Sequence, residues 1–305
     1  MPTRANSIDK LLSNIGPKWH TDIRYYSEII KEAYAPLIAA SPKQDITVTR
    51  DIAYGQHARQ VLDVFSKTGD DLNAKPVIVF VHGGAFVRGD KCLPNGMYDN
   101  VLYWFAKQGF VGINLEYRLA PEVAFPGAVD DLAMGIEWAA NNIAAHGGDP
   151  TRIALVGHSA GGTHVASYVF DPLLGHLGQH AKAAVLMCAR LRADQSPENP
   201  NTPSVKAYFG DDIAAYETKA PMAYAACSSM PVFIINAEFE NPLLDVYGLE
   251  FAHRLGQARR RSPRYLSARR HNHMSILAHF NTDEETVGPE IVDFLDQTFS
   301  VSPKR

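Results

Sequence analysis

The stretch that decides the fold reads Ile153-Ala154-Leu155-Val156-Gly157-His158-Ser159-Ala160-Gly161-Gly162. Its apolar first half predicts a buried strand, and the residues from Thr163 onward are compatible with a helix. Between them stands the pattern G-x-S-x-G, which places Ser159 on a strained strand-to-helix turn. Glycines flank the serine because larger side chains would collide there with neighbouring backbone. We therefore predict that Ser159 is a nucleophile, and that the amide of Ala160 donates to a developing oxyanion.

Around this stretch, short β-rich runs alternate with longer helical patterns, which is typical of a mainly parallel sheet. The expected strands cover residues 46–53, 61–65, 76–81, 110–116, 153–157, 183–188, 231–237 and 264–267. The clearest helix runs over residues 129–143, and a capping-box pattern at Thr282 and Glu285 predicts another. That second helix should bury Val287, Ile291, Phe294 and Leu295. We predict an α/β fold whose eight-stranded, mostly parallel sheet carries helices on both faces.

The N-terminal segment, residues 1–45, is not obviously needed by this sheet. Residues 21–38 show an amphipathic helical pattern, which either forms a small cap over the active site or packs on the outside of the domain. No internal repeat or long Gly/Ser linker divides the chain, so we expect residues 1–305 to form a single domain. We also find no large insertion between strands, which argues against an extended lipid-binding lid.

Composition and charge narrow the class of partner. With 46% hydrophobic and 20% charged residues, the chain can bury a substantial core. A net charge of -4 gives no reason to expect nucleic acid or a membrane surface, so a small-molecule substrate is expected. The three cysteines lack CxxC spacing and no HExxH occurs, so neither a metal nor an organic cofactor is predicted. Without a signal peptide or a long apolar stretch, we expect a cytoplasmic protein, with homodimer formation left open.

A second motif, His82-Gly83-Gly84-Ala85-Phe86, follows the strand expected over residues 76–81. We expect the amides of Gly84 and Ala85 to join Ala160 in an oxyanion hole, where each donor contributes on the order of 3 kcal/mol. The ring of His82 should hydrogen-bond within the loop and not act as a base. Four nearby side chains either line a pocket or belong to the core: Phe86, Tyr208, Phe209 and Met274.

Together these motifs resemble the hormone-sensitive-lipase-like carboxylesterases, family IV of the α/β-hydrolase superfamily, over about residues 76–165. The same likeness is carried by EYRLAPE at 116–122, Phe125-Pro126 and GGDP at 147–150. Two positions depart from the family pattern, since Ala85 replaces a common third glycine and His158 replaces a common aspartate. Neither departure removes a catalytic group. The resemblance implies the α/β-hydrolase fold and a serine hydrolase without cofactors.

The C-terminal part is closer to kynurenine formamidase-like enzymes of the same superfamily, through residues 237–242 and Asn272-His273-Met274-Ser275-Ile276. In this fold the triad follows the order serine, acid, histidine, with the histidine after the last strand. The match to these families favours His273 as the base, and His271 is its competitor.

The acid should follow the strand expected over residues 231–237, where Glu238, Glu240 and Asp245 offer carboxylates. We interpret Asn241-Pro242 as the N-cap and first residue of a helix, which places Asp245 in the first turn. Glu240 is favoured over Glu238, because it occupies the position of the aspartate in the formamidase-like pattern.

These residues predict acyl transfer, in which His273 takes the proton of Ser159 and water later cleaves the acyl-enzyme. We expect a carboxylesterase acting on short-chain or aromatic esters. The alternative is an arylformamidase, which would attack an amide with the same groups. A non-catalytic ligand receptor on this fold is the other alternative, although such proteins typically lose a triad residue.

Overall fold

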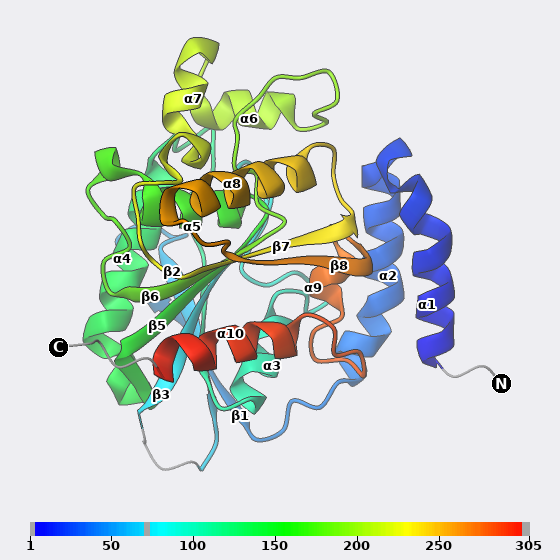
Figure 1. The fold of residues 1–305 in the computed structure, drawn as a ribbon. Coiled ribbons are helices and arrows are strands. Elements are labelled where there is room, and N and C mark those ends of the chain that lie inside the picture. The colour runs from blue at the N-terminus through cyan, green and yellow to red at the C-terminus, as the bar shows by residue number, and fades with distance from the viewer. Residues whose placement is uncertain (1–3, 70–73, 301–305) are drawn as a thin grey trace.

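One mixed sheet of eight strands organises the chain (Figure 1). The computed structural model describes residues 4–69 and 74–300. The strands are β1 (Ile46–Ala53), β2 (Val61–Lys67), β3 (Lys75–Val81), β4 (Val111–Leu115), β5 (Gly148–His158), β6 (Ala181–Met187), β7 (Val232–Phe239) and β8 (Arg264–Asn272). Their order is β1-β2-β4-β3-β5-β6-β7-β8, and all neighbours from β4 to β8 pair in parallel, whereas β2 is antiparallel to β1 and β4. Each predicted strand is present, which confirms the fold class.

Helices cover both faces of the sheet (Figure 1). One face packs against α4 (Gly127–Asn142), α5 (Ala160–Phe170) and α8 (Leu244–Arg259), and the other against α3 (Asp99–Lys107) and α10 (Gly288–Ser300). Strand β3 is apolar throughout because both of its faces are buried. Val79 packs toward the face covered by α4, α5 and α8, and its neighbours Ile78 and Phe80 pack toward the face covered by α3 and α10.

The C-terminal helix begins later than predicted. The helix α10 starts at Gly288, and Thr282 does not form a capping box with Glu285. Its Oγ1 instead donates to the carbonyl of His279 at 2.5 Å and accepts from the amide of Glu284 at 3.3 Å. Thr282 therefore stabilises a turn before the helix and does not cap the helix. The core residues predicted for this helix are all buried: Val287, Ile291, Phe294 and Leu295.

The N-terminal segment forms α1 (Arg4–Ile15), the 3₁₀ turn η1 (Gly16–Thr21) and α2 (Ile23–Ala40). Helix α2 confirms the amphipathic pattern, and Asp22 caps it by accepting from the amide of Tyr25 at 3.0 Å. Helix α1 was not predicted, although Ile8, Leu11, Leu12 and Ile15 recur at helical spacing along its buried side. The segment contacts β7, β8 and the short α9 (Ser275–Ala278). Residues 1–3, where the predicted segment starts, lie outside the described residues.

The connection between β6 and β7, residues 188–231, is as long as the predicted strands implied, and it holds several short helical elements that were not predicted. It contains α6 (Thr202–Phe209), η4 (Ile213–Ala215), α7 (Tyr216–Lys219) and η5 (Pro221–Tyr224). These elements were not assigned from the sequence, because such short helices leave little periodicity to detect. Outside this connection lie the 3₁₀ turns η2 (Ile143–His146) and η3 (Pro172–Leu174). In the part of the chain described, no helix has the length and apolar character that a membrane crossing requires.

Candidate active site

Ser159 occupies the turn between β5 and α5 with φ 55° and ψ -119°, a backbone conformation that residues other than glycine rarely adopt. A Cβ on Gly157 would lie 2.5 Å from the carbonyl oxygen of Gly161, and one on Gly161 would lie 2.1 Å from that of Val81. This confirms why both flanking positions are glycine. The amide of Ser159 donates to the carbonyl of Met187 at 3.0 Å, which fixes the turn on β6.

Ser159, His273 and Glu240 come together at the carboxyl ends of β5, β8 and β7. The Oγ of Ser159 lies 3.1 Å from Nε2 of His273, and Nδ1 of the same ring contacts Oε1 of Glu240. A carboxylate accepts only, so Nδ1 carries the proton and Nε2 is free to accept from the serine hydroxyl. His273 and Glu240 are buried while Ser159 is half-buried, which leaves the serine within reach of a substrate.

The two candidate glutamates point in different directions. Oε1 of Glu240 accepts from the amide of Asn241 at 2.7 Å, and Oε2 accepts from that of Ala237 at 3.5 Å. These donors hold the carboxylate on the histidine. Glu238 is exposed and accepts from the amide of Arg270 at 2.5 Å, away from the histidine.

The predicted helix cap at Asn241 is wrong, although Asp245 lies in the first turn of α8 as predicted. The helix begins at Leu244, after a left-handed Leu243 with φ 68°, and has no side-chain cap. Oδ1 of Asn241 accepts instead from the indole Nε1 of Trp19 at 2.9 Å. The side-chain oxygen that the sequence predicted as the cap of the helix therefore accepts from the N-terminal segment instead.

Two further side chains, His158 and Cys188, lie against the base and the acid. Burial and the nearby His273 lower the pKa of His158 well below its usual value, so the ring is neutral. Its Nε2 donates to the carbonyl of His273 at 3.1 Å. Burial, and then the Glu240 carboxylate, raise the pKa of the Cys188 thiol, which therefore stays protonated.

Within the described residues, His158, Cys188 and His273 offer potential metal ligand atoms within 4.8 Å of one another. The arrangement is explained without an ion, because both ring nitrogens of His273 already contact Ser159 and Glu240. His271, the competing base, is occupied elsewhere, since Nδ1 lies 3.1 Å from Oγ of Ser275 and Nε2 lies 3.2 Å from Glu284.

The loop after β3 runs against the serine. A Cβ on Gly83 would lie 3.1 Å from Cβ of Ser159, so the backbone approaches as closely as a side chain permits. Gly84 and Ala85 have positive φ values of 145° and 50°, and among the described residues their amides have no hydrogen-bond partner. The amide of Ala160 opens α5, where the first helical N–H groups lack intrahelical acceptors. These three predicted donors are therefore available to a substrate oxygen.

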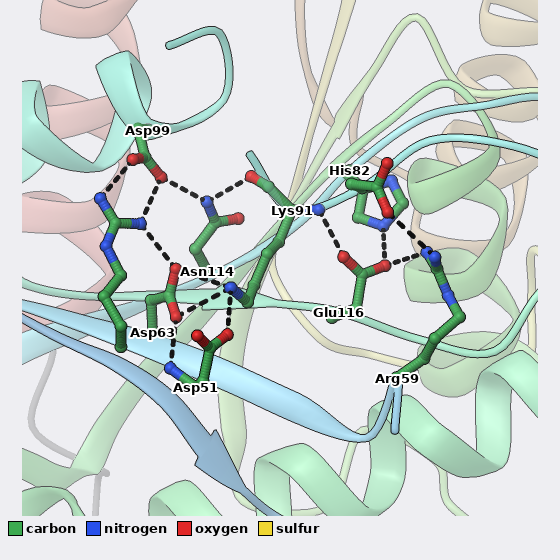
Figure 2. A network of polar contacts seen from close by, with 10 residues as sticks. Asp51, Arg59, Asp63, His82, Lys91, Asp99, Asn114 and Glu116 are labelled. Atoms are coloured by element: carbon green, nitrogen blue, oxygen red, sulfur yellow. Dashed lines mark hydrogen bonds and ion pairs between the residues drawn. The ribbon is translucent and has the colours of Figure 1, made fainter. Parts of the chain in front are cut away.

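A network of polar contacts anchors the loop after β3 through the side chain of His82 (Figure 2). Nδ1 of His82 lies 2.7 Å from the carbonyl oxygen of Gly83, and Nε2 lies 2.9 Å from Oε1 of Glu116. The ring thus bonds within the loop, as predicted. Glu116 is also paired with Arg59 and accepts from the amide of Lys91 at 2.6 Å.

The other half of the network ties residues 91–99 to β1 and β2 (Figure 2). Nζ of Lys91 lies 3.0 Å from Asp63, a fully buried carboxylate that also pairs with Arg50 at 2.7 Å. Arg50 reaches Asp99, the first residue of α3, at 2.5 Å. Buried charges persist only when paired and hydrogen-bonded, so these contacts hold the segment after the loop in one arrangement.

The aromatic residues near the motifs belong to the core. The rings of Phe86 and Tyr208 stack with centroids 4.7 Å apart and an interplanar angle of 2°, and Phe209 packs edge-on at 5.5 Å from Phe86. All three are buried, which decides between the two interpretations, whereas Met274 is half-buried. The Tyr208 hydroxyl lies 3.2 Å from Nδ1 of His164 on α5. The stacking of Tyr208 on Phe86 therefore joins α6 to the loop that carries the candidate oxyanion donors.

Comparison with known proteins places these motifs among esterases. The family model BD-FAE matches residues 62–170, from β2 to the end of α5. The isoprenylcysteine alpha-carbonyl methylesterase of Arabidopsis thaliana is 39% identical over 122 residues, which is 39% of this chain and 27% of that protein. The esterase LipC of Mycobacterium tuberculosis is 34% identical over 131 residues, 43% of this chain and 32% of that protein. The matched stretch thus spans about a third or less of these curated relatives.

Solved structures match the whole fold. An esterase of Pyrobaculum calidifontis superposes with a TM-score of 0.69 at 22% identity, over 96% of this chain and 97% of that one. A bacterial heroin esterase gives 0.67 at 22% identity, over 91% of each chain. The arrangement of strands and helices is therefore the one predicted from the motifs.

Proposed function

We propose that this chain, an α/β-hydrolase by its fold, is a serine carboxylesterase that acts on short-chain or aromatic esters. One observation carries the proposal, the hydrogen-bonded series of Ser159, His273 and Glu240 at the carboxyl ends of three parallel strands. The esterases among the similar proteins support it.

In the proposed reaction, Oγ of Ser159 attacks the ester carbonyl while Nε2 of His273 takes its proton. The carbonyl oxygen becomes an oxyanion that accepts from the amides of Gly84, Ala85 and Ala160, and Glu240 stabilises the imidazolium. The alcohol then leaves with the proton from His273, and the acyl group stays on the serine. Water, deprotonated by the same nitrogen, attacks the acyl-enzyme; the bond to Oγ of Ser159 then breaks, His273 returns the proton to that oxygen, and the carboxylic acid leaves.

Preorganisation supports this role for the loop. Each oxyanion donor contributes on the order of 3 kcal/mol only when it is fixed before the charge develops. The contact of His82 with Glu116, and the stacking of Phe86 on Tyr208, hold the loop in place without a substrate.

We further propose that the whole chain forms one domain in a reducing, cytoplasmic setting. The free cysteines Cys92, Cys188 and Cys227 support the compartment, since exported proteins of this size commonly pair their cysteines. Apolar clusters on both faces of one sheet support the single domain.

The test measures kcat/KM of wild type and Ser159→Ala on p-nitrophenyl acetate, butyrate and decanoate, phenyl acetate, and an N-formyl arylamine. We expect turnover of the short and aromatic esters, with the variant slower by about 10³-fold or more. Faster turnover of the formamide than of any ester would assign an arylformamidase instead. Equal activity of wild type and variant would refute the serine mechanism.

A further inference from the structure

Trp19 joins the N-terminal segment to the loop that carries the proposed triad acid. It lies in η1, between α1 and α2, and is only 1% exposed. Its indole N–H donates to Oδ1 of Asn241 at 2.9 Å, across 222 positions of sequence. A buried indole N–H usually finds a hydrogen-bond partner, and here that partner adjoins Glu240.

The bond leads to the acid in two steps. The backbone amide of Asn241 donates to Oε1 of Glu240 at 2.7 Å. The same oxygen contacts Nδ1 of His273. The indole therefore fixes the residue whose own N–H orients the carboxylate toward the base.

The N-terminal turn also holds the residue before the acid. A Cβ on Gly16 would lie 2.3 Å from ring carbons of Phe239, so turn and ring are in close contact. Trp19 shares its apolar cluster with Ile235 and Ala237 of β7. Figure 1 shows α1 and α2 side by side, next to the ends of β7 and β8.

Glu240 needs such support because it lies outside regular structure. Strand β7 ends at Phe239 and α8 begins at Leu244. A glutamate also has one more rotatable bond than an aspartate, so more rotamers must be excluded to hold its carboxylate in one place. Among the described residues, no donor other than Trp19 reaches Oδ1 of Asn241.

We infer that Trp19 is a positioning residue for the triad acid: through Asn241, its indole N–H holds Glu240 on His273, so that catalysis depends on the N-terminal segment. This inference rests on the proposed esterase function. It gives that segment a role in the chemistry, in addition to its packing on the sheet.

The test compares Trp19→Phe with Trp104→Phe in the full chain. Trp104, in α3, is buried in the same apolar cluster, where it packs edge-on against its neighbour Phe105 and against Phe280, which follows α9. Both variants lose an indole from this layer, but only the first loses the bond to Asn241. We measure kcat and KM on p-nitrophenyl butyrate, the pH profile of kcat/KM, and the thermal midpoint.

For Trp19→Phe we expect kcat to fall about tenfold, as the loss of one hydrogen bond in a buried network implies, with KM changed less than about twofold. The acidic limb of kcat/KM should move to lower pH, because a loosely held carboxylate stabilises the imidazolium less. Trp104→Phe should lower the thermal midpoint but leave kcat and the pH profile unchanged.

Asn241→Leu provides the second variant, since it removes the same bond and keeps the indole. If Trp19→Phe does not fold, Asn241→Leu alone decides, and the same fall in kcat is expected. In the double variant, losses that do not add would show that both residues act through one interaction.

An unchanged kcat in the folded variants, a change confined to KM, or equal effects of Trp19→Phe and Trp104→Phe would overturn the inference. The wild type separates this result from failure of the proposed function. If the wild type hydrolyses esters and the variants match it, only the role of Trp19 is wrong. If the wild type has no activity, the function is wrong.

Discussion

Replacing Glu240 by glutamine tests the acid of the proposed triad most sharply. The side chain of Glu240 is 1% exposed and that of His273 is 7% exposed, so solvent screens their interaction little. In serine hydrolases, changing the acid to its amide lowers kcat by about 10⁴-fold, or about 5.5 kcal/mol of barrier. Here the amide NH₂ would also face the N–H of Ala237 or of Asn241, which are donors themselves. We expect kcat to fall by about 10³ to 10⁴-fold.

The assay is the steady-state hydrolysis of p-nitrophenyl butyrate, with circular dichroism and thermal melting to verify folding. Glu240→Asp should retain more activity than Glu240→Gln, although the carboxylate recedes by about 1.5 Å and misplacement by 1 Å costs about 10²-fold. Glu238→Gln is the matched control and should stay within about twofold of wild type, because Glu238 is exposed. The reasoning is refuted if Glu240→Gln keeps more than a tenth of the wild-type kcat, or if Glu238→Gln lowers kcat more than Glu240→Gln does.

Three further outcomes follow from buried groups. Gly161→Ala should abolish activity and lower the melting temperature, because its Cβ would lie 2.1 Å from the carbonyl oxygen of Val81; an active, stable variant would contradict the steric account. Tyr208→Phe should cost about 1 to 3 kcal/mol in urea unfolding, since His164 loses its hydrogen bond in the core, and no change in the midpoint would refute this. Burial lowers the pKa of both His164 and His279 to about 3, so below about pH 6.5 the unfolded chain binds more protons than the folded chain. As the pH falls further, the free energy of unfolding should decrease by about 1.4 kcal/mol per pH unit for each histidine. Equal urea midpoints at pH 7.5 and 5.5 would disprove this.

Most of the fold follows from local patterns in the sequence. The strands are detectable because runs such as Val77 to Val81 are apolar on both faces, and the turn at Ser159 is detectable because only glycine fits beside it. Ends of elements are harder to predict. Strand β8 continues to Asn272, five residues past its expected end, because polar residues such as Arg269 and Arg270 conceal it.

The predicted site residues were found through motifs, whereas the residues that support them depend on tertiary contacts. Nothing near Trp19 in the sequence indicates that its indole bonds to Asn241. In the same way, Cys188 directly follows β6, and its place beside Glu240 becomes visible only when β6 and β7 pair. Trp19 lies in a turn between two amphipathic helices, and that pattern predicts its burial but not the hydrogen-bond partner of its indole.

The most direct test of the central claim is the mass of the protein after treatment with a fluorophosphonate, followed by peptide mapping. Such reagents phosphonylate an activated serine, so the account predicts one adduct per chain, on the peptide that contains Ser159. Ser159→Ala should show no adduct, and His273→Ala should react far more slowly, because the hydroxyl loses its base at 3.1 Å. No adduct on the folded wild type, or labelling of another residue, would contradict the claim that Ser159 is a catalytic nucleophile.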